Sequence, residues 1–197
     1  MSIHDSSKTI LPLLAILPLV VAPAYAEDQA IDDRLDQSRA LTAEFASRMQ
    51  NALVSAMSEG GSASAITACS EDAPGIASDL ARLSGARVGR TSLLYRNPGN
   101  APEPWQSIVL RKFEADAEQG EPVANLEYFE ILGDGGVRYM KAIPTGGVCL
   151  ACHGTGLSPD IDAVLSEAYP HDLARGYELG DIRGAFSITW PAPTGAE

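Results

Sequence analysis

The sequence predicts an α+β domain in which N-terminal helices pack on a small antiparallel sheet. Residues 35–57 carry apolar side chains at four-residue spacing, which indicates an amphipathic helix. Residues 127–132 and 137–143 are strand-like runs separated by a glycine-rich turn, which favours a β-hairpin. Near the end, residues 182–190 alternate between apolar and polar side chains, as a half-buried strand does.

Three helical segments are expected at the start of the domain. The first ends at a pair of glycines, 60–61, and its Met49 and Met57 are predicted to be core residues rather than metal ligands. The second begins near residue 64 and carries Cys69 on its apolar face. Pro74 is expected to start a third helix, because proline suits a first helical position, and Gly85 ends it.

The middle of the chain predicts a strand, a loop and one more helix. Residues 88–95 are rich in β-branched and aromatic side chains, and residues 97–102 contain turn-forming Asn, Pro and Gly. Pro104 fits the first position of a helix that Gly120 ends. Its apolar face is expected to comprise Trp105, Ile108, Val109, Phe113 and Ala117.

Cys149, Cys152 and His153 form a C-x-x-C-H motif, which is typical of covalent c-type haem attachment. Two thiols at this spacing can bond to the two vinyl groups of one porphyrin, and the adjacent imidazole becomes the proximal iron ligand. A zinc site is disfavoured because no second ligand pair has suitable spacing. A redox dithiol is disfavoured because the motif does not follow a strand in a βαβ unit.

The N-terminus has the features of a secretory signal peptide, predicted to span residues 1–26. Lys8 supplies a basic region, residues 10–21 are apolar, and Ala24 and Ala26 form an A-x-A cleavage site. The apolar segment is short and interrupted by prolines, which argues against a membrane-spanning helix. We therefore expect one domain over residues 27–197, exported to the periplasm, with no integral membrane segment after cleavage.

Composition limits the classes of partner. The formal net charge is −12, which argues against nucleic acid and anionic membranes and leaves basic partners open. The chain contains three cysteines, so one, Cys69, remains outside the motif. An unpaired cysteine in an exported protein indicates a dimer disulfide, an inert buried thiol, or a reactive or metal-bound thiolate.

The late position of the motif excludes a small all-helical cytochrome, in which a downstream methionine completes the iron coordination. No methionine follows His153 in this chain. The motif, together with residues 66–69, 90–93, 97–102 and 180–187, resembles the PAS-like c-type haem domain family, exported mono-haem proteins catalogued as a domain of unknown function.

The resemblance implies a PAS-like fold and one covalently bound haem. It implies that Cys149 and Cys152 hold the porphyrin, and that His153 and Cys69 are the two axial iron ligands. A thiolate ligand donates electron density to iron and lowers the reduction potential. If Cys69 is instead an inert buried thiol, the position opposite His153 is occupied by His171 or Met140, or it is open.

Several further side chains are candidates for contacts with the porphyrin. Tyr95 and Tyr139 are candidates for packing on its edge. Haem propionates need cationic partners when they are partly buried. The candidates for that role are Arg87, Arg90, Arg96 and Arg183.

These features predict a periplasmic mono-haem c-type cytochrome that acts in electron transfer or redox sensing. A redox partner or a separate signalling protein is expected, because no output segment is evident in the sequence. The alternatives are a gas sensor with a displaceable distal ligand and a haem enzyme of sulfur-compound oxidation. An enzyme is the less favoured interpretation, because the sequence shows no second haem motif for electron exit.

Overall fold

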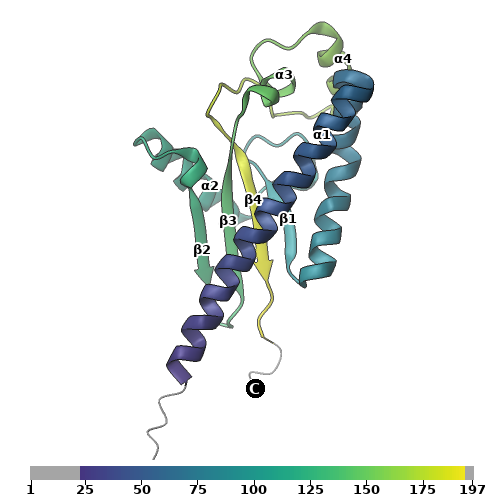
Figure 1. The fold of residues 1–197 in the computed structure, drawn as a ribbon. Coiled ribbons are helices and arrows are strands. Elements are labelled where there is room, and N and C mark those ends of the chain that lie inside the picture. Colours follow the sequence, from purple (N-terminus) through teal and green to yellow (C-terminus); the bar gives the residue numbers. More distant parts are fainter. Residues whose placement is uncertain (1–22, 194–197) are drawn as a thin grey trace, which may run out of the picture.

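A computed structural model describes residues 23–193. Most of the predicted signal peptide lies outside the described residues; residues 23–26 form the first turn of helix α1. The fold consists of a four-stranded antiparallel sheet with helices on both faces (Figure 1). The predicted α+β class is therefore confirmed, and the arrangement is compatible with a PAS-like fold.

Helix α1 (Pro23–Ser84) is a helical hairpin whose two arms meet at Gly60 and Gly61. These two residues have non-helical backbone angles, with Gly61 at a φ of +67°. The first helical segment therefore ends at this glycine pair, as predicted. The first arm runs obliquely across the sheet, and the second returns beside strand β1 (Figure 1). Gly85 follows with a φ of +77°, and its N–H donates to the carbonyl of Ala81, which ends the helix as expected.

The prediction of a separate helix starting at Pro74 is wrong, because the second arm continues through this residue. Proline inside a helix removes a backbone donor and is unfavourable by about 3 kcal/mol. Ile66, Ala73 and Leu80 lie seven residues apart on either side of Pro74, and all three are buried. Burial of this continuous stripe keeps the arm helical, while Pro74 itself is exposed.

The sheet has the strand order β1-β4-β3-β2. It comprises β1 (Arg87–Thr91), β2 (Glu127–Ile131), β3 (Val137–Pro144) and β4 (Ile182–Trp190), and all neighbours are antiparallel. The β2–β3 hairpin and β4 match the predictions. The predicted first strand extends too far, because Ser92 leaves the ladder and its hydroxyl lies within hydrogen-bond distance of two carbonyl oxygens, those of Leu94 (3.0 Å) and Arg183 (2.9 Å).

The two faces of the sheet contribute to separate cores. On one face, Phe45 and Leu80 of α1 pack against Tyr139 and Ile188. On the other face, helix α2 (Pro104–Glu118) packs through Phe113 and its neighbours against Met140 and Ala185. Strand residues alternate between the two cores because successive side chains point to opposite faces.

Helix α2 follows its prediction except at Ile108, which is 71% exposed rather than part of the apolar face. Three short 3-10 turns complete the connections: η1 (Pro98–Asn100), η2 (Val123–Asn125) and η3 (Gly147–Cys149).

The motif region occupies one end of the molecule, near the bend of α1. η3 leads directly into α3 (Leu150–His153), and α4 (Pro159–Ala168) follows. Figure 1 shows α3 and α4 at the same end as the bend of α1. Helix α4 was not predicted, although Ser158 caps it and Pro159 occupies its first turn, which is a recognisable start signal.

Candidate functional site

A cavity of about 470 Å³ lies between α1, the sheet and the motif segment. This volume is within the range of about 300–1,000 Å³ that is typical of small-molecule and cofactor sites. One part of the lining is apolar, and it includes Met49, Leu53, Met57, Ile66 and Phe186. Arg90, Arg96 and Arg183 also line the cavity, but none of its described lining residues is an aspartate or glutamate. The cavity is therefore cationic within a strongly acidic protein.

The three motif residues line this cavity from one short helical segment. Cys149 ends η3, and Cys152 and His153 lie in the single turn of α3. All three side chains are partly buried, and neither cysteine forms a disulfide. Consecutive helical turns thus place both thiols and the imidazole at one wall of the cavity.

His153 is held in the form that a metal requires. Its Nδ1 lies 2.8 Å from the carbonyl oxygen of Ala174, and because a carbonyl only accepts, Nδ1 carries the proton. Burial, with the cations Arg183 and Arg96, lowers the pKa of His153 to about 3, so the ring is neutral near pH 7. Nε2 therefore keeps a free lone pair, the state of a ligating imidazole.

Cys69 enters the same cavity from the second arm of α1. Burial raises the pKa of its thiol, while Arg90, Arg96 and Arg183 oppose that rise. The thiol is thus protonated near pH 7 and would release its proton on binding a metal. Cys69 and the motif are 80 residues apart in sequence, and the fold brings them to one cavity.

Two of the cavity arginines have no acidic partner among the described residues. Arg90 and Arg183 form no ion pair with any carboxylate in the part of the chain that the structure describes. Desolvation lowers the pKa of both guanidinium groups, but arginine stays charged in proteins. Uncompensated cations in a partly buried cavity favour an anionic ligand.

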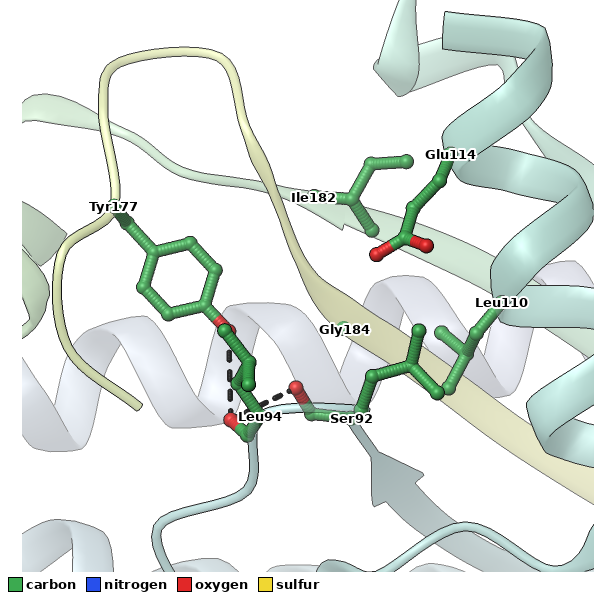
Figure 2. A pocket seen from close by; sticks show the side chains of 8 residues that line it. Ser92, Leu94, Leu110, Glu114, Tyr177, Ile182 and Gly184 are labelled. Carbon is green, nitrogen blue, oxygen red and sulfur yellow. Dashed lines mark hydrogen bonds between the residues drawn. The ribbon is translucent and has the colours of Figure 1, made fainter. Parts of the chain in front are cut away.

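A second, much smaller pocket of about 40 Å³ shares Ser92 and Gly184 with the large cavity. Figure 2 shows the hydroxyls of Tyr177 and Ser92 directed at the carbonyl oxygen of Leu94, at 3.4 and 3.0 Å. The pocket has room only for a few water-sized molecules. The Tyr177 ring also lies edge-on to His153, with ring centroids 6.2 Å apart, and so supports the imidazole from that side.

The cavity lining distinguishes the remaining candidates for contacts with a porphyrin. Arg90 and Tyr95, two of the candidates for contacts with a porphyrin, line the cavity, whereas Arg87 is exposed on β1 and pairs with Glu103. The structure argues against the prediction that Tyr139 contacts a porphyrin edge: Tyr139 lies in the α1-facing core and not in the cavity lining, and its hydroxyl donates to Glu127. Tyr139 is four residues along β3 from Ile143, which lines the cavity, and this separation is about 13 Å.

The two other side chains considered for the position opposite His153 lie outside the cavity. Met140 is fully buried in the α2-facing core and His171 is exposed, and neither lines the cavity. Met49 and Met57, predicted to be ordinary core residues, do line it. Sequence reasoning also missed Tyr169, another lining residue, whose position between Ala168 and Pro170 gives no specific signal.

Comparison with known proteins decides the family. The sequence model of the Tll0287-like family matches residues 25–191, which is most of the chain. This protein belongs to the Tll0287-like family. Among solved structures, the fold is similar to the crystal structure of the cyanobacterial haem protein Tll0287, with 24% identity and a TM-score of 0.61. That match covers 85% of this chain and 98% of the other. No curated protein gives a significant match.

Two further observations apply to the described residues of this Tll0287-like protein. No helix within them is both long and apolar enough to cross a membrane. They also contain no group of three or more His, Cys, Asp or Glu side chains arranged to hold a metal ion.

Proposed function

We propose that this protein binds one haem in the large cavity, attached through Cys149 and Cys152. His153 and Cys69 would be the axial ligands of the iron. The observation that carries the proposal is the convergence of two thiols, a neutral imidazole with a free Nε2 and a third thiol on one cavity. The similarity in fold to Tll0287, which is described as a haem protein, also supports it.

The charge distribution of the cavity fits the same group. A haem has an apolar macrocycle and two carboxylates. The apolar lining suits the macrocycle, and the unpaired guanidinium groups of Arg90 and Arg183 suit the propionates through charge-assisted hydrogen bonds. Tyr95 also lines the cavity, and its aromatic ring would contact the macrocycle.

We infer that the protein acts in the periplasm in electron transfer or redox sensing. A bound haem supplies a one-electron couple, and two protein ligands would leave no open iron position for substrate. The net charge of −12 favours a partner protein with a basic docking face.

Gas sensing is the second candidate, with Cys69 as the ligand that would leave the iron. Burial raises the pKa of Cys69 despite three nearby arginines, which favours its protonated, more weakly ligating form. A ligand of this kind can leave when the metal is reduced, which would open a site for a diatomic gas.

The first test is whether haem attaches covalently. The full chain would be produced in a bacterium with a c-type haem maturation system and denatured in acid. We expect the haem to remain on the polypeptide, and we expect a Cys149→Ser, Cys152→Ser double variant to lose it. Haem that separates from the wild-type chain under these conditions would contradict covalent attachment.

The axial ligands are tested by electron paramagnetic resonance of the ferric protein. The wild type is expected to show a low-spin thiolate signal, and Cys69→Ser is expected to lose it. A thiolate signal that survives this substitution would eliminate Cys69 as ligand. Carbon monoxide added to the reduced wild type separates the two roles: rapid binding supports gas sensing, and no binding supports electron transfer.

The proposed propionate contact has a matched control on the same strand. Arg90→Gln removes an unpaired cation from the cavity, whereas Arg87→Gln removes an exposed one that already pairs with Glu103. We expect Arg90→Gln to lower the yield of holoprotein and Arg87→Gln to leave that yield unchanged. Equal yields for both variants would argue against the contact.

A further inference from the structure

The loop at residues 172–177 is built around a buried carboxylate. The Asp172 side chain is 2% exposed and accepts hydrogen bonds from the Nε atoms of Arg96 (3.1 Å) and Arg175 (3.0 Å). It also accepts from the backbone N–H of Ala174 at 2.9 Å. Burial alone would raise the pKa of Asp172, but its bonds to Arg96 and Ala174 hold it below the usual value. The carboxylate is therefore ionised near pH 7 and fixes the shape of the loop.

Arg96 joins this loop to the motif helix. Its side chain is 11% exposed, and beyond its bond to Asp172 its Nη2 donates to the carbonyl oxygens of Cys152 (2.6 Å) and Ala174 (3.1 Å). The planar guanidinium thus contacts three acceptors on two segments of chain. The ammonium group of a lysine has no planar, fixed set of N–H donors and therefore does not reproduce these three contacts.

The carbonyl of Ala174 is the point where Arg96 meets His153. It accepts from Nη2 of Arg96 and from Nδ1 of His153, one bond for each lone pair. The acceptor that orients a ligating imidazole also sets how basic that imidazole is. A cation on the same oxygen draws electron density from it and weakens its pull on the Nδ1 proton.

We propose that Arg96 and Asp172 are positioning residues that fix His153 for axial ligation and limit the electron density it donates. The proposal rests on the proposed function, because it assigns the two residues a role toward a haem ligated by His153. It predicts that loosening Arg96 makes the imidazole a stronger donor and stabilises the oxidised state.

The test compares two lysine variants of the holoprotein. Arg96→Lys keeps the positive charge but loses the planar set of guanidinium N–H donors. Arg175→Lys is the matched control, because the Arg175 side chain donates to the same Asp172 carboxylate. Its other side-chain hydrogen bonds within the described residues go to Asp162 and Ser166, not to the carbonyls of Cys152 and Ala174 that Arg96 contacts. We expect Arg96→Lys to favour the oxidised state about tenfold, which is about 59 mV lower in a one-electron potential. Arg175→Lys is expected to leave the potential within about twofold of the wild-type equilibrium.

A second variant keeps the test decisive if Arg96→Lys gives no holoprotein. Asp172→Asn retains an acceptor but removes the charge that holds Arg96. We expect its ferric low-spin resonance to broaden or shift, because the His153 ring is less fixed. A wild-type spectrum for Asp172→Asn, or equal shifts in potential for the two lysine variants, would overturn the proposal. A wild-type protein that binds no haem would instead overturn the proposed function.

Discussion

Replacing Gly184 with alanine tests how closely the chain packs at the wall between the two pockets. Gly184 has a φ of +149°, which side chains rarely permit. A Cβ at this position would lie 2.4 Å from the carbonyl oxygen of Thr91 and 3.0 Å from Cβ of Ser92. The nearest of these atoms belongs to the backbone at the end of β1, so it cannot swing aside as the tip of a side chain does. Figure 2 shows Gly184 on β4 beside Ser92.

The expected loss of stability follows from these contacts. The unfavourable φ costs about 1–3 kcal/mol. Moving the Thr91 carbonyl away also disturbs the β1–β4 ladder, where each hydrogen bond contributes about 0.5–1.5 kcal/mol. We expect Gly184→Ala to lower the free energy of unfolding by about 3 kcal/mol, which is a factor of about 100 in the folded population.

Urea unfolding followed by far-ultraviolet circular dichroism measures this loss. Gly89→Ala is the matched control: Gly89 lies in β1 opposite Ser187 of β4, and a Cβ there would meet nothing within 4 Å. We expect this control to differ from the wild type by less than about 1 kcal/mol. Similar unfolding free energies for the two variants would refute the reasoning.

Three further predictions concern stability. Ser38→Ala removes the buried hydroxyl that accepts from the Trp190 indole at 2.9 Å; urea titration should show a loss of about 1–3 kcal/mol, and an unchanged midpoint would contradict this. Pro74→Ala restores a donor inside α1 and should raise the thermal midpoint, whereas a lower midpoint would show that proline is favoured there. Asp172 stabilises the fold above its unfolded pKa of about 3.8, and this contribution is lost as the pH falls through its lower folded value. The stability difference between wild type and Asp172→Asn should therefore shrink between pH 6 and pH 3, and a constant difference would exclude this linkage.

Local patterns predicted most of the elements because their causes are local. The glycine pair at 60–61 ends one arm of α1, and the turn at 133–136 joins β2 to β3, as expected. The errors have tertiary causes. Helix α1 continues through Pro74 because a buried stripe extends on both sides of it. Strand β1 stops at Thr91 because Ser92 bonds to the carbonyl of Arg183, 91 residues away.

The candidate site divides in the same way. A c-type haem motif is recognisable in sequence because the attachment chemistry needs two thiols and an imidazole at fixed spacing. The contact of Arg96 with Asp172 has no such signal, because the two residues are 76 positions apart and either alone is an ordinary charged residue. Tyr139 and Tyr95 are equivalent by sequence, and only their positions relative to the cavity distinguish them.

The sequence by itself determined the C-x-x-C-H motif, the cysteine outside it, the strong negative charge and the order of most helices and strands, because each depends on residue type and short-range spacing. Tertiary structure alone decided that Cys69 and His153 face one cavity. It also decided that Arg90 and Arg183 have no carboxylate partner among the residues that the structure describes, and that His153 presents a free Nε2. The physical reason is that burial and hydrogen bonding between distant segments, which no local pattern encodes, set the charge and protonation state of these groups.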